Sequence, residues 1–383
     1  MPTEPFNQDK ELAEFFTDVE HLREMFKNLV AAPTLPKRLF MIHGVGGVGK
    51  SSLLRMFHLH CKGARVPVAL ASGDEAKSAL DVLYFKSPSG EERGWVPDLK
   101  ADGVHFPKFD ATFEYYRAIQ AKVDTEAQKT RGKIADLAGK AAGKTAETAA
   151  AAAAGAALGS IIPGIGTIAG AIGGMGAEAL VDWMRGFLTK PDIDLLLDPT
   201  SKLTNDFLDD LAKTAGKKRS VLRVLYEFLK FTLSRTKFAQ NWANRQKRIV
   251  LMLDTFEQMT ALEDWACDIA QRLPPNTLFV VAGRALPNWG RAWSEWMANA
   301  QVEELKPMTE DVMRELIWRY YATMRGGEPN PIQVDAIIRF ACGLPMIVTS
   351  AVQLWVKYGV EDFQSVKAEI VANLVDRLME GVP

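Results

Sequence analysis

The residues whose types and spacing indicate chemistry most directly lie in the stretch GVGGVGKSS, from Gly44 to Ser52. It satisfies the pattern G-x-x-x-x-G-K-[ST], in which glycines let successive backbone N–H groups point into one concavity around a phosphate. The helix that follows adds the partial positive charge of its N-terminus. In such a loop Lys50 reaches the β- and γ-phosphates, and the Ser51 hydroxyl binds Mg²⁺. The predicted phosphate-binding residues are Gly44, Gly46, Gly47, Val48, Gly49, Lys50, Ser51 and Ser52.

Charged side chains follow two later apolar stretches, each of which reads as a buried strand. The stretch 248–254 ends in Asp254, with Glu257 three residues beyond, and the stretch 277–282 is followed by Gly283 and Arg284. Ligands collect at the carboxyl edge of a parallel sheet, so Asp254 is expected to hold Mg²⁺ there. Glu257 is expected to polarise the attacking water and Arg284 to contact the γ-phosphate. A solvated turn residue and a surface arginine are the alternatives for these two.

Strands and helices that would position these residues alternate along the chain. The expected strands are 40–43, 65–71, 248–254, 277–282 and 301–305. A helix or a pair of helices is expected at 10–30, before the glycine-rich loop. Beyond Thr309 the pattern is helical, with breaks at 326–329 and 343–345. This alternation predicts an α/β fold in which helices flank a parallel sheet.

Residues 85–198 are predicted to form a largely helical insertion, because far more residues than the fold requires separate the second strand from Asp254. The insertion begins with a stretch rich in proline and glycine at 86–109, which is expected to be a long loop or a small irregular segment. It continues with a charged helical pattern at 111–144. Its most unusual part is the charge-free run 148–177, rich in alanine and glycine.

The charge-free run leaves three interpretations open. A break at Pro163–Gly166 divides it into arms of about fourteen residues, whereas a membrane-spanning helix needs about twenty. The run could insert into a membrane as a hairpin, pack across a subunit interface through its glycine-lined face, or be buried within the fold. We expect the hairpin to be sheltered at rest and exposed on activation.

The stretch between the insertion and Asp254 is expected to be helical and basic. A helix is predicted from Leu203, with Thr204 or Asn205 as its N-cap. From 213 to 248 there are eleven basic residues and one acidic residue, Glu227. Apolar residues are threaded through this run, which favours a helix with a solvated basic face over a surface that binds phosphates.

The composition is that of an ordinary soluble protein. The chain has 383 residues and a formal net charge of −1, which gives no general attraction to nucleic acid or to acidic lipid. Three scattered cysteines give no disulfide framework, and the first ten residues lack the apolar core of a signal peptide. These features favour the cytoplasm, with membrane association on activation as the one addition.

Two further patterns are better explained by packing than by ligand binding. The stretch His58-Leu59-His60-Cys61 contains metal-ligand types, but adjacent residues of a helix face different directions. Trp289, Trp293 and Trp296 have helical spacing, which is more typical of a buried stripe than of a partner surface.

Five phrases of the sequence, taken together and in this order, resemble the STAND class of P-loop NTPases, which is related to AAA+ proteins and includes the NB-ARC and NACHT families. They are GVGGVGKSS (44–52), IVLMLDTFE (249–257), LFVVAGR (278–284), VEELKPMTEDV (302–312) and CGLP (342–345). The similarity is closest to bacterial members, covers roughly 15–59 and 203–354, and leaves the middle of the chain unexplained.

The resemblance implies a P-loop NTPase core of the ASCE, AAA+-like type with a C-terminal helical subdomain. It implies ATP or ADP with Mg²⁺ as cofactors, Asp254 as a metal ligand, Arg284 as the sensor arginine and Pro345 beside the nucleotide. Two features depart from the family. Residues 16–19 stand where a Gly-Arg pair normally flanks the base, and about forty residues after Pro345 are too few for a full winged helix.

The expected function is therefore an ATP-binding, slowly hydrolysing switch whose nucleotide state controls self-association, contact with a partner protein, or exposure of the hairpin. The expected segments are 1–84 and 199–306 as the two halves of the NTPase core, 85–198 as the insertion, and 307–383 as the helical subdomain. The alternatives are a membrane-associated ATPase motor of the KAP type, and a scaffold that binds nucleotide without turnover.

Overall fold

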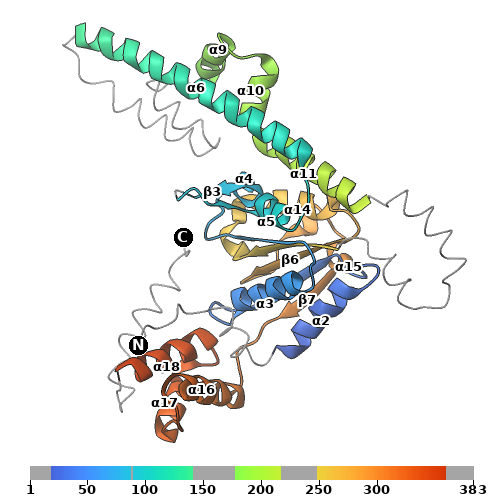
Figure 1. Ribbon diagram of the computed structural model, residues 1–383, viewed down its shortest axis with the longest axis vertical. Coiled ribbons are helices and arrows are strands. Elements are labelled where there is room, and N and C mark those ends of the chain that lie inside the picture. The colour runs from blue at the N-terminus through green and yellow to red at the C-terminus, as the bar shows by residue number, and fades with distance from the viewer. Residues whose placement is uncertain (1–18, 88, 141–176, 217–247, 359–383) are drawn as a thin grey trace, which may run out of the picture. The chain divides into compact units, whose positions relative to one another are not determined.

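The computed structural model describes residues 19–87, 89–140, 177–216 and 248–358 of the chain (Figure 1). The chain divides into two compact units. The first contains residues 1–77, 81–104 and 214–383, and the second contains residues 78–80 and 105–213. The expected hairpin at 148–177 and nearly all of the basic run 213–248 lie outside the described residues.

The first unit is built on a five-stranded parallel sheet with the strand order β2-β5-β6-β1-β7. Its strands are β1 (Leu39–His43), β2 (Val68–Ser72), β5 (Ile249–Asp254), β6 (Thr277–Gly283) and β7 (Ala300–Glu304). In the register of the ladder, His43 lies opposite both Gly283 and Glu304, so the carboxyl ends of these strands are level with one another. The predicted parallel α/β sheet is confirmed, and all five strands lie within a few residues of their expected bounds.

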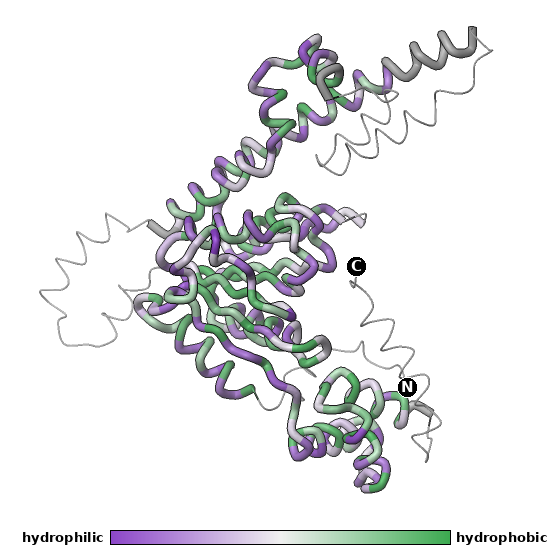
Figure 2. The backbone as a smooth tube through the Cα atoms, turned by 180° about the vertical axis from the view of Figure 1, so that it is seen from behind, coloured by the Kyte–Doolittle hydropathy of each residue, from purple (hydrophilic) through white to green (hydrophobic). Residues whose placement is uncertain are grey.

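Helices cover both faces of the sheet (Figure 1). They are α2 (Glu20–Ala31), α3 (Lys50–Gly63), α5 (Trp95–Ala101) and α14 (Glu263–Arg272). On one face Phe26 of α2 stacks on Phe57 of α3 at 4.0 Å between ring centroids, and Phe57 packs on Phe40 of β1. On the other face Trp95 of α5 packs edge-on against Phe279 of β6. Figure 2 shows the hydrophobic colouring along the strands between these layers.

A small helical subdomain follows β7 within the same unit. It contains α16 (Glu310–Arg325), α17 (Pro331–Ala341) and α18 (Pro345–Tyr358), which share one apolar core. Gly326 and Gly343, each with a positive φ, lie at the two breaks between these helices. The predicted helices up to residue 358 and both predicted breaks are confirmed, and residues 359–383 of the expected subdomain lie outside the described residues.

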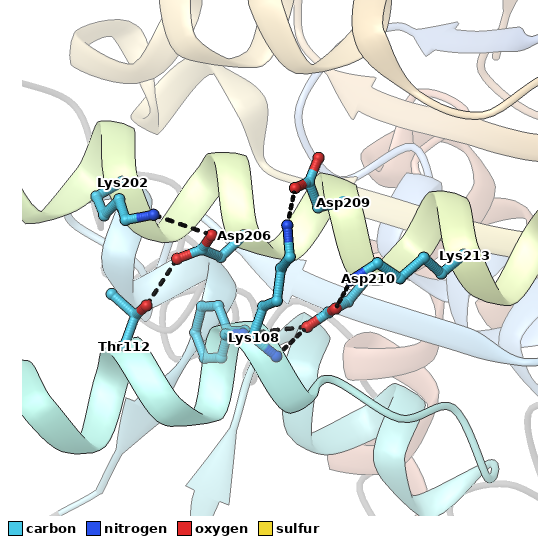
Figure 3. Close-up of polar contacts among 8 residues, drawn as sticks. Lys108, Thr112, Lys202, Asp206, Asp209, Asp210 and Lys213 are labelled. Carbon is cyan, nitrogen blue, oxygen red and sulfur yellow. Dashed lines mark hydrogen bonds and ion pairs between the residues drawn. The ribbon is translucent and has the colours of Figure 1, made fainter.

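The second unit is helical and is held by one apolar cluster and a polar contact between two helices. Its helices are α6 (Pro107–Lys140), α9 (Ala177–Arg185), α10 (Lys190–Leu197) and α11 (Pro199–Gly216). At the N-terminus of α6, the backbone N–H groups of Lys108 and Phe109 donate to Asp210 of α11, at 2.7 and 3.1 Å (Figure 3). One turn further along α6, the Thr112 hydroxyl donates to Asp206 of α11 at 2.7 Å.

Short elements complete the described chain. They are α4 (Ala79–Leu83), β3 (Phe85–Lys86), β4 (Glu92–Arg93), three 3₁₀ turns at 256–258, 260–262 and 289–291, and α15 (Trp296–Asn299). Among the residues that the structure describes, no helix is both long and apolar enough to cross a membrane.

Three local expectations were wrong. The stretch 86–109 contains α5, because Trp95 is fully buried and its indole N–H donates to the Met252 carbonyl at 3.1 Å. Helix α11 begins at Pro199, so neither Thr204 nor Asn205 is its N-cap. The three tryptophans do not share one helix.

Tryptophan burial nevertheless follows part of the predicted stripe. Trp289 lies in a 3₁₀ turn and Trp296 begins α15. Both side chains are buried, and their rings pack edge-on at 5.7 Å between centroids. The spacing of the tryptophans therefore predicted burial at two of the three positions, but it did not predict the secondary structure.

Candidate functional site

A cavity of about 1000 Å³ lies at the carboxyl edge of the sheet. Each of the five strands contributes residues at or just beyond its carboxyl end, and the first turn of α18 contributes Pro345 and Met346. All of the predicted site residues except Gly44 and Asp254 line this cavity. Those two are buried beside it, at the ends of β1 and β5.

The glycine-rich loop connects β1 to α3, as its sequence predicts. Gly47 and Gly49 have φ values of 77° and 102°, which an L side chain rarely adopts, and α3 begins at Lys50. The Lys50 ammonium turns back onto its own loop and donates to the carbonyl oxygens of Gly44 at 2.7 Å and Val45 at 2.9 Å. The loop therefore holds a buried cation against main-chain oxygens at the start of a helix.

Burial and the neighbouring carboxylates act on the pKa of Lys50 in opposite directions. Burial lowers the pKa of Lys50, the negative charges of Glu257 and Asp254 oppose this effect, and the positive charge of Arg284 adds to it. An anionic ligand in the loop would favour the ammonium form, and the N-terminus of α3 would attract the same ligand.

Asp254 ends β5 as a buried carboxylate, with 7% of its surface exposed. It accepts a hydrogen bond from the Thr255 N–H at 2.8 Å and another from the Ser51 hydroxyl. Burial raises the pKa of Asp254, and these two hydrogen bonds oppose the shift. The chain bends sharply at this point, because Thr255 has a φ of 49°. The bend follows the strand end directly and turns the next residues along the edge of the sheet.

Glu257 and Arg284 are brought together at the same edge from two neighbouring strands. The Arg284 Nε lies 3.1 Å from one carboxylate oxygen of Glu257, and the Arg284 backbone N–H donates to the other at 3.0 Å. Gly283 leaves room for this contact, since a Cβ there would lie 3.3 Å from the Glu257 carboxylate. Both residues are thus part of one arrangement beside the cavity.

The residues present fit Mg²⁺ in the manner usual for a phosphate site. Within the described ranges, no group of three or more His, Cys, Asp or Glu side chains gathers in a way that would hold a metal ion alone. Mg²⁺ usually takes one or two protein oxygens and completes its shell with phosphate oxygens and water. The hydrogen-bonded pair Ser51 and Asp254 supplies such oxygens next to the glycine-rich loop.

Several lining residues were missed by the sequence reasoning. Asp74 lies just beyond the carboxyl end of β2, and Asp254 lies at the carboxyl end of β5. The argument that predicted Asp254 from the end of its strand could therefore have predicted Asp74 too. His21 of α2 and Met346 of α18 also line the cavity. The sequence gives no signal for either, because their place depends on how distant helices pack against the sheet.

The chain was compared with protein-family models, with curated proteins and with solved structures, and none of the three comparisons returns a match.

Proposed function

We propose that this cavity binds ATP with Mg²⁺ and hydrolyses it slowly, and that the bound nucleotide acts as a conformational switch. The observation that carries the proposal is the meeting of four groups at one sheet edge. These are the glycine loop with its buried Lys50, the bonded pair Ser51–Asp254, the pair Glu257–Arg284, and the N-terminus of α18.

Phosphate binding rests on the loop. Lys50 donates to two loop carbonyls in a position from which its ammonium can turn toward a polyphosphate. Backbone N–H groups at the start of α3 and the helix dipole favour the same charge. The strand order supports an ASCE-type core, because β6 lies between the loop strand β1 and the Asp254 strand β5.

Hydrolysis rests on the carboxylates. Ser51 and Asp254 would hold Mg²⁺, which when bound neutralises charge on the phosphate oxygens. Glu257 lines the cavity and accepts from Arg284, so it is placed to take a proton from water, and Arg284 is placed to sense the terminal phosphate. The Glu257–Arg284 pair occupies both groups with each other, which suits slow turnover.

The proposed switching role rests on the residues of the helical subdomain that line the cavity. One wall of the cavity is formed by Met308, which precedes α16, and by Leu316 and the first turn of α18 in the helical subdomain. We place the nucleoside toward this wall when the phosphates occupy the loop. A ligand that touches both the sheet and the subdomain can bias their arrangement, because it contributes differential contacts to the two states. We propose self-association, or exposure of residues 148–177, as the output.

The test is calorimetric titration of the full chain with ATP and ADP, with and without Mg²⁺. Lys50→Ala should weaken ATP binding by at least about 100-fold, because it removes the phosphate-binding cation. Lys62→Ala is the matched control, since Lys62 is on the same helix and pairs with Asp102 at 2.7 Å. Unchanged affinity in Lys50→Ala would refute the proposal.

Phosphate release and light scattering complete the experiment. Slow release with a change in molecular mass between ATP and ADP is expected of a switch. Fast turnover without such a change would indicate a motor, and binding without any release would indicate a scaffold.

A further inference from the structure

The linker 305–308, which joins β7 to α16, is held at its first residue by the phosphate loop. The Leu305 N–H donates to the His43 carbonyl at 2.7 Å, which continues the ladder between β1 and β7. A Cβ on Gly44 would lie 2.4 Å from the Leu305 carbonyl oxygen, so only glycine permits this approach. The first glycine of the loop therefore seats the start of the linker.

The end of the same linker is held by Gly343. The Met308 N–H donates to the Gly343 carbonyl at 2.8 Å. Gly343 has a φ of 81°, and a Cβ there would lie 2.6 Å from the Pro307 Cβ and 2.8 Å from the Met308 carbonyl oxygen. Real Cβ atoms essentially never come closer than 3.0 Å, and here the atoms met are a proline ring and backbone, which cannot turn away.

The contacts return from Gly343 to the phosphate loop. Pro345 begins α18 two residues after Gly343, and Pro345 and Met346 both line the cavity. The Met346 methyl group lies 3.3 Å from where a Cβ on Gly47 would be. The glycine loop, the linker and the start of α18 thus form a closed chain of close contacts around one side of the cavity.

We propose that Gly343 is a positioning residue, which seats the start of α18 over the phosphate loop and so sets the wall against which the nucleoside half of the ligand binds. The inference rests on the proposed function and adds a residue to it. Gly343 does not itself line the cavity, so it acts through Pro345 and Met346.

The helical subdomain supplies a matched control for the substitution. Gly326 has a φ of 75°, close to that of Gly343, but a Cβ there would meet nothing within 4 Å. Gly343→Ala and Gly326→Ala therefore both place an L side chain at a positive φ in the same subdomain, and of the two only Gly343→Ala introduces a collision. Gly326→Ala thus controls for a positive-φ substitution that meets no neighbouring atom.

The first experiment compares two ligands, Mg²⁺–ATP and Mg²⁺–tripolyphosphate, by calorimetry on the full chain. Tripolyphosphate can occupy only the phosphate loop. Gly343→Ala should weaken ATP binding about tenfold and leave tripolyphosphate binding unchanged, while Gly326→Ala should change neither. Equal ATP affinity in Gly343→Ala and the wild type, or equal losses in both variants, would overturn the role of Gly343.

The second experiment uses the ligand-free protein and follows hydrogen exchange at the Met308 amide, which donates to Gly343. Exchange should become faster in Gly343→Ala and not in Gly326→Ala. Loss of ATP affinity without faster exchange would overturn the proposed route. If the wild type binds neither ATP nor tripolyphosphate, the proposed function fails and takes the positioning role with it. Binding of both ligands by the wild type with no selective loss in Gly343→Ala refutes only the positioning role.

Discussion

Two buried aspartates, one in each compact unit, show how a carboxylate that stabilises the fold differs from one that faces a ligand site. Asp210 of α11 is 1% exposed and accepts from two backbone N–H groups at the start of α6 (Figure 3). It therefore completes a helix N-terminus, and its charge is matched by the helix dipole and by the Lys213 ammonium, 3.4 Å from a carboxylate oxygen. Asp254 is 7% exposed and accepts from one backbone N–H and from the hydroxyl of Ser51.

The two aspartates differ in which neighbouring groups stabilise their negative charge. At Asp254 burial raises the pKa, so the fold itself disfavours the ionised form. The neighbouring Lys50 donates to loop carbonyls, and Arg284 is engaged with Glu257. A carboxylate that the fold disfavours and that lies beside a cavity is stabilised when a cation binds, which is the pattern expected of a functional site.

The largest expected effect that separates a site carboxylate from a structural one is the effect of Glu257→Gln on the rate of ATP hydrolysis. Glu257→Gln keeps an acceptor oxygen for the Arg284 N–H but removes the group that takes a proton from water. The rate of phosphate release should fall about 100-fold or more, while ATP affinity and stability stay close to wild type. Glu263→Gln is the control, because Glu263 also accepts a backbone N–H, from Asn288, but does not line the cavity. Equal rates in the two variants would make Glu257 a structural residue like Asp210.

The next effect concerns discrimination between nucleotides. Arg284→Ala should lower the ratio of ATP affinity to ADP affinity about tenfold, because the guanidinium would meet only the terminal phosphate. Affinity for ADP should be nearly unchanged. Calorimetric titration with both nucleotides measures the ratio. Equal losses for ATP and ADP would remove the sensing role and leave Arg284 as a partner of Glu257.

Much of the cavity lining at the sheet edge could be predicted from the sequence, because its signals are local. The glycine pattern fixes the loop from Gly44 to Ser51, and apolar stretches that end in Asp254 and Arg284 fix which side chains reach the sheet edge. Parallel pairing then brings the strand ends together without further information.

The structural carboxylate could not be predicted in this way. Asp210 meets Lys108 and Phe109 across about a hundred residues of sequence, and no local pattern marks an acidic residue on one helix as the cap of another. The same limit explains Trp95, whose surroundings of proline and glycine hide a short buried helix. Gly343 is similar, since its need for glycine arises from the distant Pro307 and Met308.

A third prediction tests the structural half of the comparison. Asp210→Asn keeps the shape of the side chain but removes the charge that matches the N-terminus of α6. The variant should lose about 1 kcal/mol of stability, with unfolding followed by circular dichroism in urea. Asp209→Asn is the control, because Asp209 is more than half exposed and pairs with the exposed Lys108 side chain. A loss no larger than that of the control would contradict the capping role.

The smallest expected effect is a gain in stability in Asp254→Asn, whereas Asp210→Asn should lose stability. Burial raises the pKa of Asp254 in the folded state above the ordinary aspartate value of the unfolded chain. Above the folded-state pKa the native carboxylate carries the full cost of its charge. As the pH falls from the folded-state pKa toward the ordinary aspartate pKa, this cost in stability shrinks. Below the ordinary pKa, Asp254 is protonated in both the folded and the unfolded state, and the cost is absent.

Asp254→Asn should therefore melt at a higher temperature than the wild type when nucleotide and Mg²⁺ are absent, by roughly 2–4 °C for each kcal/mol gained. Asparagine can still accept from the Thr255 N–H and donate to Ser51, so few contacts are lost. The difference in melting temperature should be largest above the folded-state pKa of Asp254 and should shrink as the pH falls toward the ordinary aspartate value. Adding Mg²⁺ and ATP should reverse the order, because the variant lacks the Asp254 carboxylate that would bind the cation beside Ser51. A variant that melts below the wild type above that folded-state pKa without ligands would place Asp254 with Asp210, among the carboxylates that hold the fold together.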